Sequence, residues 1–397
     1  MHIASIGLAA LTLLIWLGIF FFNGHFWQTW IADSDREAVS PPSNWPSVIA
    51  IVPARNEAAT IAQTVTALAR QDYPGNFSIM VVDDHSEDAT GEFARKAATE
   101  AGAASRAQIL SAPPLAPGWT GKLWALQSGI ESAKSQAPDF FWFTDADVVH
   151  APDTLRRLIS RAESDRLDLT SLMVLLQTQS FAEKLLIPAF LYFFLMLYPP
   201  RWIANPKSRT AGAAGGCILL RSTALARIGG LVSIRDEIID DCALARAVKR
   251  SDGRIWMGLT RASVSLRRYS RLSELQDMIA RTAFTQLYYS VFLLLGTLAG
   301  MMLTFVLPVA LAFSTNARIW LPALLAWCLM SASFLPTVVF YRLSPIWSAF
   351  LPFAALFYSY STLLSAVRYW LGRGGQWKGR AQAPRTPQNS GSGPGSE

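Results

Sequence analysis

The chain has 397 residues, of which 51% are hydrophobic and 16% are charged, and its formal net charge is +7. Soluble domains usually carry about a quarter of charged residues, so part of this chain is expected to lie outside water. The central region has no dense run of Lys and Arg with interleaved aromatic residues, which argues against nucleic acid as a partner.

The first predicted element is an apolar helix over residues 3–22, which contain no charge. About 20 such residues span the hydrocarbon core of a bilayer. A cleaved signal peptide would have a basic start, a shorter apolar stretch and a small-residue cleavage site, and none of these is clear before Trp27. We therefore expect a retained membrane anchor over residues 1–30.

The polar region from about residue 31 to 270 alternates short apolar runs with stretches of helical pattern. The strands are expected at 47–52, 79–82 and 140–143, and the helices at 58–69, 89–103 and 123–133. This alternation predicts an α/β domain with a mainly parallel sheet and helices on both faces. Ligands of such sheets bind outside the carboxyl ends of the strands, and all three strands end in polar or acidic residues.

Polar residues follow the first two strands directly. Pro53, Arg55 and Glu57 lie in the first loop, where the next helix could meet a ligand anion, although a capped helix start explains them as well. Asp83 and Asp84 end the second strand and could accept hydrogen bonds from a nucleobase or a ribose.

The third strand is followed by Asp145 and Asp147, with one residue between them. Two carboxylates at this spacing can hold Mg²⁺ or Mn²⁺ against a diphosphate, because these hard cations prefer oxygen ligands and keep positions open for phosphate. Lys122, after Gly121, could neutralise the same diphosphate, although both residues also suit a simple turn.

A second acidic pair, Asp240 and Asp241, opens a predicted helix through residues 244–248. Capping of that helix is one interpretation. The other makes Asp241 a general base, with its pKa raised by the like charge of Asp240. The small residues at 212–216 suit a place where backbone must approach a ligand closely, or again a turn.

Two further segments are ambiguous between a membrane-surface and a water-soluble location. Residues 185–203 are apolar and aromatic but contain Pro188, Pro199 and Pro200, and suit either an interfacial helix or a buried core helix. Residues 263–277 combine basic and apolar positions and suit either an interfacial segment or an ordinary solvated helix.

Three apolar runs at 283–313, 319–341 and 346–371 are each long enough to cross a membrane. The tail at 373–397 is basic at first and then rich in Gly, Ser and Pro, which predicts partial disorder. One anchor and three later crossings would place this basic tail opposite the central domain, whereas the positive-inside rule favours the cytoplasmic side. Either one run does not cross, or the charge rule fails here.

Taken together, the motifs P-A-R-N-E, V-D-D-H-S-E-D-A-T, D-A-D and I-D-D resemble the inverting family-2 glycosyltransferases with a GT-A fold. Longer strings at 117–125, 209–219, 239–249, 281–287 and 377–380 resemble the hopanoid-biosynthesis-associated membrane branch of that family. The resemblance implies a GT-A-like domain over 31–270, with an interfacial segment and about three membrane helices over 271–372.

The resemblance also implies residue roles. Pro53, Arg55, Glu57, Asp83 or Asp84 and Lys122 would bind the nucleotide-sugar, Asp145 and Asp147 would contact the ribose, the metal and the diphosphate, and Asp241 would be the base beside Asp240. The expected partners are a nucleotide-sugar, a lipid-like acceptor and the membrane, with no obligatory protein partner. The three widely spaced cysteines show no zinc or disulfide pattern and favour a reducing compartment. We therefore expect a multi-pass protein of the inner (plasma) membrane with its catalytic domain facing the cytoplasm.

The sequence departs from the family pattern in one place. Related synthases carry the string Q/R-x-x-R-W, and the nearest match here is Arg281–Thr285, which lacks the final Arg-Trp pair. This argues against a processive polysaccharide synthase, which is the alternative enzyme. A membrane protein that binds a nucleotide-sugar without catalysis is the alternative of another class.

Overall fold

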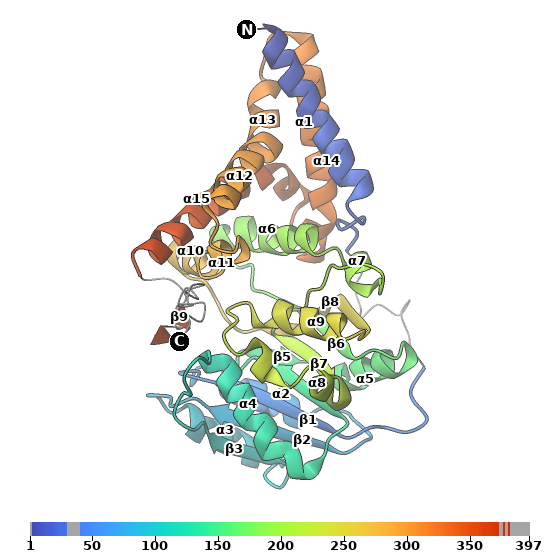
Figure 1. Ribbon diagram of the computed structural model, residues 1–397, viewed down its shortest axis with the longest axis vertical. Coiled ribbons are helices and arrows are strands. Elements are labelled where there is room, and N and C mark those ends of the chain that lie inside the picture. The colour runs from blue at the N-terminus through green and yellow to red at the C-terminus, as the bar shows by residue number, and fades with distance from the viewer. Residues whose placement is uncertain (1, 30–39, 373–375, 378–379, 382–397) are drawn as a thin grey trace, which may run out of the picture.

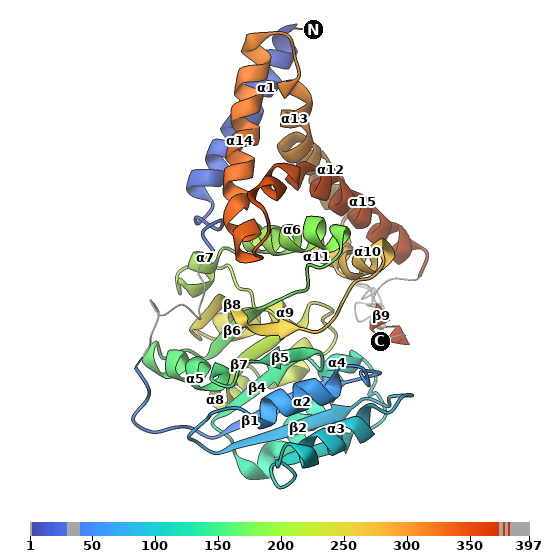
Figure 2. The same ribbon diagram turned by 180° about the vertical axis from the view of Figure 1, so that it is seen from behind.

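The computed structural model describes residues 2–29, 40–372, 376–377 and 380–381. A sheet domain lies at one end of the molecule and a bundle of apolar helices at the other, with helix α6 lying crosswise between them (Figures 1 and 2). The strands are β1 (Val48–Ala54), β2 (Phe77–Asp83), β3 (Ala107–Ser111), β4 (Phe140–Thr144), β5 (Val148–His150), β6 (Leu169–Leu175), β7 (Cys217–Arg221), β8 (Ile255–Ser265), β9 (Gln376–Trp377) and β10 (Arg380–Ala381).

The helices of the sheet domain and its border are α2 (Ile61–Ala69), α3 (Thr90–Glu100), α4 (Gly121–Ala133), α5 (Thr154–Ser164), α6 (Phe181–Leu197), α7 (Pro200–Ala204), α8 (Ser222–Arg227), α9 (Asp240–Arg250), α10 (Leu272–Ala280) and α11 (Ala283–Gln286). The helices of the apolar bundle are α1 (His2–Phe22), α12 (Val291–Met301), α13 (Leu307–Ala312), α14 (Ala317–Phe340) and α15 (Leu351–Trp370). Short 3-10 turns lie at Lys134–Gln136, Leu231–Ile234 and Pro345–Phe350.

The main sheet has eight strands in the order β3-β2-β1-β4-β7-β6-β8-β5. Strands β3, β2, β1 and β4 run parallel, β7 runs antiparallel to both β4 and β6, β8 runs parallel to β6, and β5 runs antiparallel to β8. The predicted mixed α/β sheet with apolar helices at both ends of the chain is therefore confirmed.

Both faces of the sheet are covered, because alternate residues of a strand point to opposite sides. On β1, Val48, Ala50 and Val52 pack with α2, α3 and α5, whereas Ile49 and Ile51 pack with α4 and the cluster that reaches the apolar bundle. The β1 strand is buried along its whole length, which explains its unbroken apolar sequence.

Helix α2 begins at Ile61, three residues later than the sequence pattern predicts. Residues 58–60 belong instead to the loop that follows β1. In this loop Asn56 takes a left-handed backbone conformation with φ 51°. The Ala58 N–H in this loop donates to Asp88 Oδ2 at 3.2 Å. A side-chain acceptor on a neighbouring loop thus replaces the first helical hydrogen bonds, and periodicity along one segment cannot reveal that.

Most of residues 185–203 form α6, which agrees with the interpretation as a buried helix. Helix α6 starts with a capping box between Ser180 and Glu183, and many of its side chains are buried. It packs against α10, α14 and α15 while it lies across the border between the two regions (Figure 1). It is therefore a buried helix at the base of the apolar bundle.

Four helical segments of the described chain are long and apolar enough to cross a membrane, namely Ile3–Phe22, Val291–Ala312, Ala317–Phe340 and Pro345–Trp370. The second segment starts later than predicted, because 283–290 form the short α11 and a turn. It contains a π-helical stretch at Met302–Val306, where Trp16 of α1 donates its indole N–H to the Thr304 carbonyl at 2.7 Å. That bond links the N-terminal helix to the later ones.

The expected interfacial segment at 263–277 is divided between two elements, since Ser263 belongs to β8 and α10 starts at Leu272. The predicted disorder of the tail falls on residues outside the described ones, apart from β9 and β10, which pair antiparallel.

Candidate active site

The carboxyl ends of β1, β2 and β4 meet at one edge of the sheet. Ala54 pairs with Asp83, and Ile51 pairs with Phe143, so the loops that follow these strands start side by side. Helix α9, which carries Asp240 and Asp241, reaches the same edge from the other half of the domain. Five of the predicted site residues, namely Pro53, Lys122, Asp145, Asp240 and Asp241, are thereby brought together near the end of β4.

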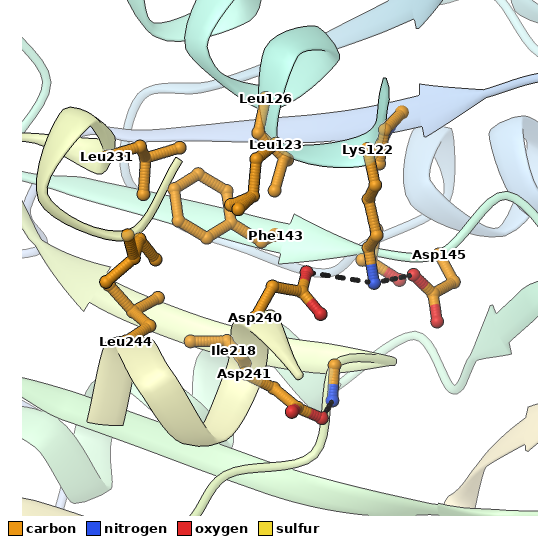
Figure 3. A pocket seen from close by; sticks show the side chains of 14 residues that line it. Lys122, Leu123, Leu126, Phe143, Asp145, Ile218, Leu231, Asp240, Asp241 and Leu244 are labelled. Carbon is orange, nitrogen blue, oxygen red and sulfur yellow. Dashed lines mark hydrogen bonds and ion pairs between the residues drawn. The ribbon is translucent and has the colours of Figure 1, made fainter. Parts of the chain in front are cut away.

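A cleft at this edge is lined by Lys122, Asp145, Asp240 and Asp241 on its polar side (Figure 3). Pro53 at the end of β1 also lines it. The opposite wall consists of apolar side chains, namely Leu123, Leu126, Phe143, Ile218, Leu231, Ile234 and Leu244. Charged groups beside a low-dielectric wall interact more strongly than they do in water.

Lys122 connects the carboxylates of this cleft (Figure 3). It lies in the first turn of α4, and its Nζ is 2.8 Å from Asp145 Oδ1 and 3.5 Å from Asp240 Oδ2. Burial disfavours the ammonium, but the charges of Asp145 and Asp240 outweigh burial and raise the pKa of Lys122 above its usual range. The lysine is therefore a fixed positive charge at the centre of an acidic cluster.

Asp241 differs chemically from its neighbours. Burial, and then the charge of Asp240, raise the pKa of Asp241 to about 6, although Lys122 and two backbone N–H groups oppose the shift. Gly215 N donates to Asp241 Oδ2 at 2.9 Å, and Cys242 N donates to Oδ1 at 2.7 Å. These bonds fix the orientation of a carboxylate whose pKa is close to neutral pH, as a general base requires.

The small-residue loop at 212–216 is held by contacts from several elements. Ser171 Oγ accepts from Ala214 N at 2.8 Å, and Thr144 Oγ1 donates to the Gly216 carbonyl at 3.0 Å. A Cβ added to Gly215 would lie 3.1 Å from Lys122 Nζ and 3.4 Å from Asp241 Oδ2. The loop thus has to consist of small residues, because backbone and charged side chains meet here.

His150 is a buried residue behind the site that the sequence analysis did not single out. Its Nε2 lies 2.7 Å from Thr144 Oγ1, and its Nδ1 lies 2.7 Å from Ser263 Oγ. Burial lowers the pKa of His150 to about 3, so its ring is neutral. Because the Thr144 hydroxyl donates to Gly216, we assign the ring proton to Nε2. A single histidine after D-A-D gives no sequence signal for this network.

The residues expected to bind the nucleotide form the neighbouring loops and mostly lie outside the cleft. Arg55 is 8% exposed, and its Nη1 donates to the carbonyls of Asp84 and His85 at 2.6 and 3.1 Å. Asp83 Oδ1 accepts from Ser86 N at 3.0 Å and from Ser86 Oγ at 2.5 Å. Glu57 donates its backbone N–H to Thr90 Oγ1 at 2.8 Å. These bonds connect the loops after β1 and β2.

Asp147 lies outside the cleft that Asp145 lines. Its carbonyl accepts from Leu266 N at 2.7 Å, and its side chain is half-buried near Tyr269, whose pKa it helps to raise after the larger effect of burial. No group of three His, Cys, Asp or Glu side chains in the described residues is arranged to hold a metal ion. Any divalent cation here would need further ligands from a bound substrate or water.

The sheet domain is similar to a known family. Residues 49–229 match the family model "Glycosyl transferase family 2". This part of the chain therefore resembles members of that family. No curated protein sequence matches it significantly.

Among solved structures, the chain resembles the mannosyltransferase PcManGT from Pyrobaculum calidifontis, in complex with GDP-Man and Mn²⁺, with a TM-score of 0.56 at 17% identity. The likeness covers 93% of this chain and 99% of that one, so the two share a fold along nearly their whole length. Glucosyl-3-phosphoglycerate synthase from M. tuberculosis matches 61% of this chain and 80% of its own, with a TM-score of 0.38 and 20% identity.

Proposed function

We propose that this protein transfers a sugar from a nucleotide-sugar to a lipid-like acceptor at a membrane surface, with Asp241 as the general base. The observation that carries the proposal is the oriented carboxylate of Asp241, with a pKa of about 6, in a cleft next to Lys122 and Asp145. The apolar helices that border the same domain support the lipid acceptor.

The reaction would be a single displacement. Asp241 takes the proton of an acceptor hydroxyl, and the resulting nucleophile attacks the anomeric carbon of the sugar. The bond between that carbon and the diphosphate oxygen breaks, and the nucleoside diphosphate leaves with the electron pair. Attack from the face opposite the leaving group inverts the anomeric carbon and needs no covalent enzyme intermediate.

Lys122 would stabilise the leaving diphosphate. Its ammonium already lies between Asp145 and Asp240, so a diphosphate that enters the cleft meets a fixed positive charge at the place where negative charge develops. Pro53, Arg55, Glu57, Asp83 and Asp84 would bind or shape the pocket for the nucleoside. Arg55 would do so indirectly, because it fixes the carbonyls of Asp84 and His85.

The proposal includes a divalent cation held by Asp145 and Asp147, which follow β4. The side chain of Asp145 is 36% exposed and keeps one carboxylate oxygen apart from Lys122, and Asp147 follows two residues later. Mg²⁺ is usually held by one or two carboxylates together with substrate phosphates, so these two residues would suffice with a bound diphosphate. The cation would supply further charge neutralisation at the leaving group.

The membrane side of the site is connected to the base. Gln286 in α11 donates to Tyr198 Oη at 2.7 Å, and the Tyr198 ring would lie 3.1 Å from a Cβ on Gly212. Gly212 lies in the same loop as Gly215, whose N–H donates to Asp241. The loop that orients the base is thus linked through Tyr198 to α11.

We place the protein in the inner membrane as a multi-pass protein with the catalytic domain in the cytoplasm, where nucleotide-sugars are available. Cys217 and Cys242 of the sheet domain are free, in keeping with a reducing compartment for the domain. The branch that the sequence resembles makes a role in hopanoid biosynthesis the first to examine.

Two alternatives make different predictions. A processive polysaccharide synthase would extend a polymer and yield a ladder of products. A nucleotide-sugar-binding membrane protein would bind the donor without turnover.

The test is incubation of native membranes that contain the full-length protein with a panel of radiolabelled nucleotide-sugars, followed by lipid extraction and mass analysis. A single labelled lipid that carries one added sugar is expected. A polymer ladder would support the synthase, and donor binding with no labelled product for any member of the panel would contradict the proposed transfer.

A further inference from the structure

The last apolar run, residues 345–371, begins next to the sheet domain. Helix α14 comes before it, and Arg261 in β8 donates from Nε to the Phe340 carbonyl at 2.9 Å and from Nη2 to the Val339 carbonyl at 3.1 Å. These bonds anchor the carboxyl end of α14 to the sheet domain. The run that follows therefore starts on that side of the apolar bundle.

The run then turns back along α14. The 3-10 turn Pro345–Phe350 packs against α14, and Trp327 Nε1 donates to the Ala349 carbonyl at 3.2 Å. Trp327 lies about 20 Å from Phe340 along the helix at 1.5 Å per residue. The chain has thus moved away from the sheet domain before α15 begins at Leu351.

Helix α15 returns to the side from which the run started. Tyr358 Oη donates to the Leu186 carbonyl in α6 at 3.0 Å, and Ser365 Oγ donates to the Ala280 carbonyl at the end of α10. Near the end of α15, Arg368 forms an ion pair with Asp277 of α10 at 2.7 Å. Both views show α15 sloping down from beside α14 to α10, next to the sheet domain (Figures 1 and 2).

We propose that residues 345–371 form a re-entrant membrane segment, which enters and leaves the bilayer on the side of the catalytic domain. The inference rests on the membrane location in the proposed function. It reduces the number of crossings to three, made by α1, by the segment from α12 to α13, and by α14.

The outer face of α15 is apolar and suits contact with the acyl chains of the bilayer. One stripe of the helix is apolar and exposed at a spacing of three and four residues, and it comprises Phe353, Leu356, Tyr360, Leu363, Val367 and Trp370. The opposite face carries small residues such as Ala354, Ala355 and Ala366, which let α15 pack closely on its neighbours. The partner of the stripe is the acyl-chain region of the leaflet that adjoins the catalytic domain.

The same stripe continues onto a crossing helix, because Phe292 and Leu295 of the neighbouring α12 are exposed as well. Exposure of this combined apolar surface to water is unfavourable. Acyl chains can cover it without burying unpaired polar groups. The proposal also removes the conflict with the positive-inside rule. The sequence after α15 is basic, and with three crossings the chain leaves α15 on the side of the catalytic domain, as that rule favours.

The test is cysteine accessibility in sealed membrane vesicles of both orientations, with the full-length protein and a membrane-impermeant maleimide. The background is Cys328→Ser, because Cys217 and Cys242 are buried. Three single variants report the sides, namely Ser135→Cys on the sheet domain, Thr315→Cys between α13 and α14, and Ser390→Cys in the tail.

In vesicles that expose the catalytic domain, we expect Ser390→Cys and Ser135→Cys to react at least tenfold faster than Thr315→Cys. In vesicles of the opposite orientation, we expect Thr315→Cys to react instead. Reaction of Ser390→Cys together with Thr315→Cys would overturn the re-entrant segment. A fluorescent protein fused after Glu397, tested for protease protection, measures the same topology without a change inside the chain. Both readouts are independent of sugar transfer, so a failure of the proposed enzyme activity would be recognised separately.

Discussion

Lys122 Nζ lies 2.8 Å from Asp145 Oδ1, and this ion pair joins the start of α4 to the end of β4. The same ammonium lies 3.5 Å from Asp240 at the start of α9. Three elements from both halves of the sheet domain are thus held together by one positive charge. A diphosphate that binds in the cleft would compete with these two carboxylates for the lysine.

Replacement of Lys122 by Met should lower kcat/KM for the nucleotide-sugar by about 10²-fold, the usual effect of losing one group that stabilises developing charge. Because Lys122 lowers the pKa of Asp241, the acid limb of the pH profile should also move above pH 6. Lys122→Arg keeps the charge and serves as the control. Equal kcat/KM for Lys122→Met and the parent would contradict the role of the lysine.

Asp240→Asn should shift the pH dependence in the opposite direction. The charge of Asp240 helps to raise the pKa of Asp241 to about 6, so its removal should lower that pKa. Asp241 acts as a base only when ionised, and activity should therefore persist to lower pH than in the parent. The measurement is kcat/KM between pH 4.5 and 8. An acid limb that stays at its parental position would show that Asp240 does not control the base.

Gly215→Ala should reduce transfer by about tenfold while the fold is retained. The new Cβ would lie 3.1 Å from Lys122 Nζ, so this ammonium has to move by a few tenths of an ångström, whereas Asp241 Oδ2 at 3.4 Å would be in ordinary contact. A misplacement of 1 Å can cost about 10²-fold, so a smaller shift of Lys122 is expected to cost about tenfold. Gly296→Ala is the matched control, because nothing lies within 4 Å of its added Cβ. The prediction fails if both variants retain parental activity.

Asp147→Ala should abolish the part of donor binding that depends on a divalent cation. Asp145 and Asp147 are the carboxylates expected to hold the cation, and Asp145 alone already shares one oxygen with Lys122. The measurement is the Kd of the nucleotide-sugar by calorimetry, with and without Mn²⁺, for the parent and the variant. If Mn²⁺ strengthens donor binding equally in both proteins, Asp147 is not a ligand.

The sequence was sufficient to predict the edge of the sheet where the polar groups gather. Apolar strands that end in Pro53, Asp83 and Asp145 follow directly from periodicity and strand-end polarity, and the register of β1, β2 and β4 agrees. Lys122 and Gly215 were also anticipated as residues that could approach a bound group. These features are local, because each is encoded within one strand or helix and the loop beside it.

Other features of the site depend on contacts between segments that are distant in sequence. The histidine network joins His150 to Ser263, a separation of 113 residues, and the link from Gln286 to Tyr198 spans 88. Arg55 matched a ligand-binding motif, yet its guanidinium binds the backbone of the next loop. Neither hydropathy nor motif spacing contains information on such pairings.

The number of membrane crossings was beyond the sequence for a similar reason. The run at 346–371 is long and apolar enough to cross, and hydropathy cannot distinguish a straight crossing from a segment that turns back. The proposed re-entrant segment rests on contacts from Trp327 to Ala349 and from Arg368 to Asp277, which hold parts of the run against α14 and α10.

Deprotonation of the acceptor by Asp241 is tested by comparing Asp241→Asn with the parent in single-turnover transfer to lipid, alongside the Kd of the nucleotide-sugar. Asn keeps an oxygen that can accept the Gly215 N–H bond but cannot take a proton at neutral pH. We predict that the rate falls by at least 10³-fold while the Kd changes by less than about threefold. Transfer by Asp241→Asn at the parental rate would contradict the account.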